Sequence, residues 1–191
     1  MRRAAASFLL LIALTTGLVA QSLSARIDRD QLHISTPRLH FLTGEALERL
    51  RNGATVRYEL QLTARTERNG KVLTRALEQF AVSYDLWEEK FAIAKLGASP
   101  RSVSHLSAAA AEAWCIENTS MPVAGLSGNP SFWLRLDYQA DSPAASSADQ
   151  PGNSGFTLSG LIDILSRRTR AEQVHGFEEA GPLRLENLKK K

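Results

Sequence analysis

The chain has a single cysteine, Cys115, and so cannot form an internal disulfide. Its stability must therefore come from the packing of apolar side chains rather than from cross-links. Cys115 lies between Trp114 and Ile116, with no base or positive charge beside it in the sequence. We interpret it as a buried filler residue rather than a nucleophile. The absence of a cysteine near the N-terminus also argues against a lipidated exported protein.

The motifs of common enzymes and metal sites are missing as well. HExxH, paired CxxC, GxGxxG, a P-loop and GxSxG do not occur. The four histidines are scattered through the chain, at positions 33, 40, 105 and 175, without clustered ligand partners. The adjacent glutamates at 88–89 and 178–179 are expected to point apart, whereas an acid/base pair must face a common cleft. We therefore predict a non-enzymatic protein with no catalytic residue, no metal and no cofactor.

The body of the chain has no excess of one charge. The whole sequence holds 23 lysines and arginines against 20 acidic residues, a net charge of +3. Removing the first 20 of the 191 residues removes Arg2 and Arg3, which leaves 21 basic residues against 20 acidic ones. Three of these basic residues are the terminal lysines 189–191. Such a body lacks the basic surface that phosphate neutralisation requires, so we do not expect nucleic acid as a partner.

The one long apolar run stands at the N-terminus. Two arginines in the first three residues precede a hydrophobic stretch from Ala4 to about Ala20, which closes on small residues before Gln21. This is the pattern of a secretory signal peptide, and we predict cleavage after Ala20. Retention as an uncleaved anchor is the alternative, but about 17 residues is short for a bilayer span. Residues 21–191 then form a single exported domain, periplasmic or extracellular, whose membrane contact ends with cleavage.

Alternating apolar and polar residues predict a meander of three β-strands in the middle of the chain. The first strand covers 54–68, and the dipeptide Asn69-Gly70 after it favours a two-residue type I′ turn. The second strand covers 73–87, and a second reversal at 88–90 leads to a third strand over 91–94. Each strand has one face for the core and one for water.

Two helices and two further extended segments flank this meander. An early extended segment covers 31–42 and is interrupted at Pro37, and another amphipathic strand covers 130–140. Helices are predicted over 43–52 and 104–117. The stripe of the second helix that we expect to face the core consists of Leu106, Ala109, Ala110, Ala113 and Trp114.

The C-terminal quarter of the chain begins with a polar stretch. Residues 141–154 are rich in Ser, Ala, Pro, Gly and Asp, and we expect a mobile loop because they offer no burial to offset ordering. An amphipathic helix from Leu158 to about Leu165 and an edge strand over 181–188 are predicted after it. The resulting fold class is mainly β with short helices (α+β), an antiparallel β-sandwich or curved sheet with two or three packed helices.

Two tryptophans are the candidate binding residues. Trp87 and Trp133 both stand at the parity opposite to the core-facing positions of their predicted strands, and Trp133 is followed on that face by Arg135. Exposed aromatic residues on a sheet face are a common basis for partner contact. The alternative is that a helix packs over this face and buries both tryptophans.

Several runs of the sequence resemble a family of uncharacterised bacterial exported domains. These runs are LTGEALERLRNGATVRYELQLTA, QFAVSYDLWEEKFAI, SVSHLSAAAAEAW and FWLRLDYQ, and together they cover about residues 31–140. The family's YxLSYxxLxxxYxL-like hairpin is kept here as Ser83, Tyr84, Leu86 and Phe91. The resemblance implies a domain of unknown function, with a signal peptide, in the bacterial envelope. It implies no catalytic residues.

We expect an exported, non-enzymatic binding domain that contacts a protein or another component of the bacterial envelope. Two alternatives stay open, a carrier of a small apolar ligand and a hydrolase with dispersed active-site residues. A binding domain predicts an exposed aromatic patch. A carrier predicts an internal apolar cavity, and a hydrolase predicts a cleft where a histidine and a carboxylate converge.

Overall fold

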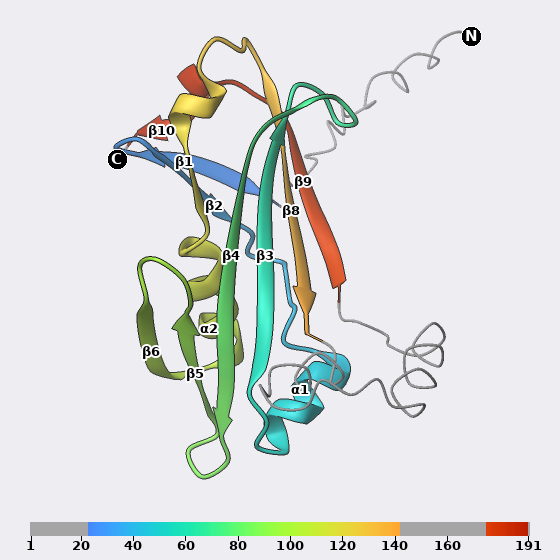
Figure 1. Cartoon of the computed structure of the whole chain (residues 1–191), viewed down its shortest axis with the longest axis vertical. Helices are drawn as coiled ribbons and strands as arrows, with labels where there is room; N and C mark the ends of the chain where they lie inside the picture. Colours follow the sequence, from blue (N-terminus) through green and yellow to red (C-terminus); the bar gives the residue numbers. More distant parts are fainter. Residues whose placement is uncertain (1–22, 142–174, 191) are drawn as a thin grey trace, which may run out of the picture.

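A six-stranded antiparallel sheet forms the main layer of the protein (Figure 1). The computed structural model describes residues 23–141 and 175–190. The strand order of the sheet is β6-β5-β4-β3-β8-β9, and neighbouring strands run antiparallel throughout. The strands are β3 (Val56–Arg65), β4 (Val72–Asp85), β5 (Lys90–Lys95), β6 (Arg101–Leu106), β8 (Phe132–Ala140) and β9 (His175–Leu183).

A smaller sheet and two α-helices complete the described fold. The smaller sheet has the order β10-β1-β2-β7, in which only the β1–β10 pair is parallel. Its strands are β1 (Ser24–Asp28), β2 (Gln31–Ser35), β7 (Ser120–Pro122) and β10 (Lys189–Lys190). The helices are α1 (Gly44–Arg51) and α2 (Ala108–Glu117), with short 3-10 turns η1 (Val123–Leu126) and η3 (Leu185–Asn187). The predicted mainly β fold with packed short helices is confirmed.

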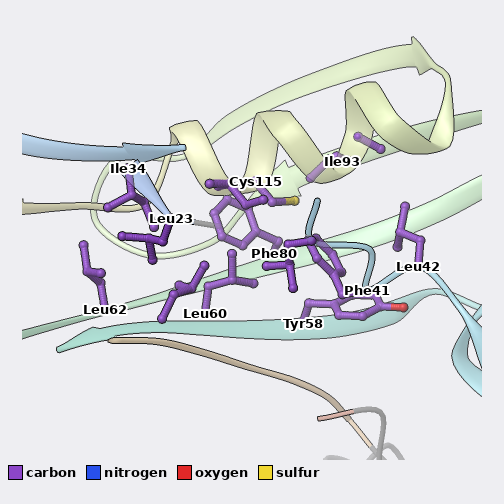
Figure 2. Close-up of a cluster of buried hydrophobic side chains, with 14 of the residues drawn as sticks. Leu23, Ile34, Phe41, Leu42, Tyr58, Leu60, Leu62, Phe80, Ile93 and Cys115 are labelled. Atoms are coloured by element: carbon purple, nitrogen blue, oxygen red, sulfur yellow. The ribbon is translucent and has the colours of Figure 1, made fainter. Parts of the chain in front are cut away.

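The core lies between the six-stranded sheet and a layer made by the small sheet, α2 and the segment after β2 (Figure 2). Removing these apolar side chains from water stabilises the fold by about 1.5–3 kcal/mol for each fully buried large one. The sheet contributes Val56, Tyr58, Leu60, Leu62, Phe80, Val82, Phe132, Leu134 and Leu136, and the opposite layer contributes Leu23, Leu32, Ile34, Phe41, Cys115 and Ile116.

The predicted meander is confirmed, but its first turn differs from the predicted type. Thr66 N–H donates to the carbonyl of Lys71 at 3.0 Å, and Gly70 N–H donates to the carbonyl of Glu67 at 3.0 Å. Asn69 does not adopt the positive φ that a type I′ turn needs. The register shifts at the end of β3, between Ala64 and Arg65, and six residues, 66–71, rather than two connect the strands.

Helix α2 begins later than predicted and buries a different face. Residues 101–106 form the edge strand β6, and Ser107 caps the helix by accepting the N–H of Ala110 at 3.3 Å. An alanine-rich helix has little contrast between its faces, so the pattern does not reveal which one turns inward. The buried residues are Ala111, Glu112, Cys115 and Ile116. Of the predicted stripe, Leu106 and Trp114 are half-buried against the core, while Ala109, Ala110 and Ala113 are exposed.

The predictions for the two ends of the chain have a mixed outcome. The C-terminal edge strand exists as β9, but it covers His175–Leu183 rather than 181–188. The predicted signal peptide with cleavage after Ala20 and the helix from Leu158 lie outside the described residues, as does the predicted loop at 141–154 apart from Asp141. Within the two described ranges, none of the helices has the length and apolar character needed to cross a bilayer.

Candidate functional site

The turn between β4 and β5 presents two large apolar side chains to solvent. We call the segment Asp85–Lys90 the hairpin tip; Figure 1 shows it projecting beyond the body of the sheet. The side chain of Trp87 is 96% exposed and that of Leu86 is 56% exposed. Trp87 therefore contributes almost nothing to the core, although apolar side chains of this size usually gain by burial.

Hydrogen bonds hold the hairpin tip in one conformation. The Asp85 Oδ1 atom accepts the backbone N–H of Trp87 at 2.8 Å and that of Glu88 at 3.0 Å. These two bonds lower the pKa of the Asp85 carboxyl below its ordinary value. Glu89 adopts a φ of 53°, in the left-handed region. The Glu88 carboxylate lies 3.0 Å from Nε2 of His105 on β6, which ties the turn to the neighbouring edge strand.

The surroundings of the exposed tryptophan are acidic. Asp85, Glu88 and Glu89 are all exposed, and Lys90 is the only cation of the segment. Three carboxylates against one ammonium give the hairpin tip a local negative charge. The tip thus combines an apolar centre with an acidic rim.

Trp133 lies at the opposite end of the sheet and is not part of the same patch. It is half-buried on β8, where it pairs in register with Arg65, close to the β3–β4 turn. The guanidinium of Arg68 lies 5.9 Å from the centroid of its ring. On its other side the ring packs so closely against Gly181 of β9 that an added Cβ would approach it to 2.5 Å.

The prediction that Trp87 and Trp133 share one face of the sheet is therefore wrong. Trp87 is in a turn rather than a strand, because the alternation of β4 ends at Asp85. Within the described residues, the groups that contact the Trp133 ring come from β9 and the β3–β4 turn. The predicted helix from Leu158 lies outside this part of the chain.

Arg135 lies on the face of the six-stranded sheet turned away from the core, which we call the outer face. Its guanidinium donates to Asp137 at 2.8 Å and stacks 3.9 Å from the ring centroid of Phe177. A longer contact of 3.5 Å reaches Glu179. The hydrogen bonds to Asp137 raise the pKa of Arg135 above its ordinary value. Arg135 is thus already paired within its own sheet.

The outer face carries a shallow groove with a volume of about 340 Å³. Glu59 lines the groove and accepts hydrogen bonds from Gln79 and Gln139, each at 2.7 Å. Leu77 and Phe177, on its sides, are 54% and 52% exposed. Because the polar groups named here already have partners, a ligand in this groove would gain few new hydrogen bonds.

His40 and His105 each lie beside a carboxylate away from the outer-face groove, whereas His175 lines that groove together with Glu59 and Asp137. His40 Nδ1 lies 2.8 Å from Glu112, a carboxylate that also accepts two backbone N–H groups. His105 and Glu88 lie at the exposed hairpin tip. Cys115 is buried, as predicted, and its burial raises the pKa of the thiol. Over residues 23–141 and 175–190, no group of three or more His, Cys, Asp or Glu side chains is placed to hold a metal ion.

No protein-family model, no curated protein and no solved structure matches the chain. The resemblance to exported bacterial domains therefore stays a prediction from the sequence.

Leu86 and Glu112 are the two residues of interest that the sequence analysis missed. Leu86 follows the apolar alternation of β4 and was expected on the core face, but the strand ends one residue earlier. The run Glu88-Glu89-Lys90 was the available signal that the chain turns here. Glu112 gave no signal, because a glutamate in an alanine-rich helix is normally exposed.

Proposed function

We propose that this protein is an exported, non-enzymatic interaction domain of the bacterial envelope, and that the hairpin tip is its contact with a partner protein. The observation that carries the proposal is the 96% exposure of Trp87 on a turn held by side-chain and backbone hydrogen bonds. Tryptophan is enriched among residues that dominate binding energy at interfaces. A turn ordered before binding loses less conformational entropy on contact, which favours affinity.

The chemistry of the tip indicates the kind of partner. Leu86 and Trp87 would enter an apolar pocket, and the carboxylates of Asp85, Glu88 and Glu89 would face basic groups around its rim. A membrane surface is less suited to the same tip, because the three carboxylates repel anionic lipid headgroups. We therefore favour a protein pocket with a positively charged border.

The proposal is tested by capture from detergent-solubilised envelopes on the immobilised full chain, with variants that differ at one exposed residue. Trp87→Ala should lose the partner at least tenfold, whereas Phe177→Ala, an exposed aromatic residue of the outer face, should retain it. Glu89→Lys should weaken capture and Glu67→Lys, an exposed glutamate in the β3–β4 turn, should not. Trp87→Ala should change the free energy of unfolding by less than about 0.5 kcal/mol, so a loss of capture is not a loss of fold.

Two results would contradict this proposal. Equal capture by wild type and Trp87→Ala would remove the tip from the interface. Trp87-dependent binding to protein-free phospholipid vesicles would assign the tip to a membrane surface instead.

The two alternatives from the sequence have less support. The outer-face groove is open to solvent and mixes charged and amide groups with Leu77, Tyr138 and Phe177, so it is not the internal apolar cavity that a carrier predicts. For a hydrolase, Glu112 beside His40 already accepts two backbone N–H groups, and Cys115 is buried. His175 shares the outer-face groove with Glu59 and Asp137, but Glu59 is hydrogen-bonded to Gln79 and Gln139, and Asp137 to Arg135. The non-enzymatic interaction domain therefore stays the favoured proposal.

A further inference from the structure

A second groove lies between the small sheet and the segment that follows β9. Its volume is about 500 Å³, and β1 and β2 form one wall while residues 182–188 form the other. Figure 1 shows η3 and β10 beside β1 at this end of the molecule. The groove is remote from the hairpin tip in the chain and shares no lining residue with it.

The hairpin of β1 and β2 gathers polar side chains at this groove. The register pairs Ser24 with Ser35 and Arg26 with His33, and directly opposed residues of two strands project on the same side of a sheet. All four residues line the groove. His33 uses its Nδ1 atom in a 3.3 Å contact with the carbonyl of Glu117, so its Nε2 atom stays available.

The lining of the groove carries positive charge and no acidic side chain. Arg26 comes from β1 and Arg184 from the segment after β9. Arg184 has only a long contact, 3.6 Å, with the exposed Glu186. Two arginines from distant parts of the chain therefore face one groove.

Arg26 has an unmet hydrogen-bonding requirement. Its Nε atom is buried and has no hydrogen-bond partner in the described part of the chain. A buried donor without an acceptor costs about 1–3 kcal/mol, and a charged one more. The buried Nε atom is closed to solvent, so an anion in the groove would contact the terminal nitrogens of the Arg26 guanidinium, whose forked geometry suits carboxylate and phosphate oxygens.

The remaining lining is apolar and comes from both walls. Pro182, Leu183 and Leu188 line the groove on the side of residues 182–188, while Ala25 and Ile34 of the other wall pack toward the core. A volume of about 500 Å³ is within the range of small-molecule sites. We propose that this groove binds an amphipathic anion, a carboxylate or phosphate monoester with a short hydrocarbon part, with Arg26 and Arg184 holding the charged group.

The test is a titration of the full chain with octyl phosphate and with octanoate, below their micelle concentrations, followed by calorimetry and amide chemical shifts. We expect at least one of the two anions to bind saturably, with shifts concentrated in residues 24–35 and 182–188. Their relative affinities distinguish a phosphate from a carboxylate ligand. Inorganic phosphate should bind at least tenfold more weakly, and octyl glucoside should not saturate the site.

Three variants separate the groove from general charge effects. Arg26→Gln and Arg184→Gln should each weaken binding of the preferred anion at least tenfold, while Arg101→Gln, on the exposed strand β6, should leave the affinity unchanged. Arg184 lies outside the strands, so its replacement keeps the test valid if Arg26→Gln unfolds the hairpin. The proposal is overturned if neither anion binds wild type, or if Arg184→Gln and Arg101→Gln bind with the same affinity. If inorganic phosphate binds as tightly as octyl phosphate, the claim that the ligand has a hydrocarbon part is overturned.

Discussion

The carboxylate of Glu112 in α2 accepts the backbone N–H of Phe41 at 2.7 Å, across 71 positions of sequence. The same oxygen accepts the N–H of Leu42 at 2.8 Å, and the other oxygen lies 2.8 Å from His40 Nδ1. Only 4% of Glu112 is exposed. One buried side chain thus supplies acceptors to the segment that connects the small sheet to α1, where no strand partner is present to satisfy them.

Replacement of Glu112 by alanine should destabilise the fold by about 2–4 kcal/mol. The change leaves the N–H groups of Phe41 and Leu42 buried without acceptors, and each such group costs about 1–3 kcal/mol. Glu112→Gln keeps one acceptor oxygen and should lose less. Urea unfolding of the three proteins measures the difference; equal stability of Glu112→Ala and wild type would show that water satisfies the two N–H groups.

The order of the hairpin tip should depend on pH through Asp85. Its folded-state pKa is lowered from the ordinary value of 3.8 by the N–H groups of Glu88 and Trp87. The stabilisation is therefore fully present above the ordinary pKa and is lost as the pH falls through the lower folded-state pKa. The amide signals of Trp87 and Glu88 should titrate together below pH 3.8 in NMR spectra. In Asp85→Ala this joint titration should be absent. A titration midpoint of the two amide signals above pH 3.8 in the wild-type protein would contradict the hydrogen-bonded turn.

Gly181→Ala should destabilise the protein by about 1–3 kcal/mol, the usual range for overpacking. The added Cβ would approach the Trp133 ring to 2.5 Å, so the ring or β9 must shift. Gly53→Ala is not a suitable control, because Gly53 has a positive φ. Trp133→Leu, which replaces the ring by a smaller side chain, gives a better control. In thermal unfolding, Gly181→Ala should cost less stability in the Trp133→Leu background than in the wild-type background. Additive costs would mean that the glycine and the ring are independent.

The thiol of Cys115 should not react in the native protein. It is buried against the core, and burial raises its pKa, so almost no thiolate forms at neutral pH. A chromogenic disulfide reagent should therefore label one equivalent of thiol in denaturant and almost none without it. Fast labelling of the native protein would indicate that α2 opens from the sheet.

Strand periodicity was the most informative part of the sequence. The alternation around Tyr58 and Leu136 predicted both the strands and their buried faces, because each strand has one wet and one dry side. The strand that contains Ser104, β6, was missed, because most of its residues are exposed at the sheet edge and no alternation marks it. The prediction of which face of α2 packs on the core was wrong for its alanines. Alanine at nearly every position gives no contrast between faces, and Glu112 turns inward to satisfy backbone groups.

The candidate site could be predicted only in part. The sequence left both exposure and burial of Trp87 open and placed it on a sheet face with Trp133, since parity alone does not show where a strand ends. The Asp85 hydrogen bonds that end β4 depend on a side-chain conformation. The groove at Arg26 was not predicted at all, because it joins β1 to residues 182–188, more than 150 positions away, and no local pattern records that contact.

The most direct measurement of the interaction proposal is photo-crosslinking in intact cells, with a photoreactive phenylalanine analogue placed at position 87. The same analogue at position 177, an exposed aromatic site of the outer face, is the matched control. We predict one dominant protein adduct at position 87 that is absent at position 177 and weakened when Glu89 is replaced by lysine. No protein adduct at position 87, or the same adducts at both positions, would contradict the assignment of the hairpin tip as the contact surface.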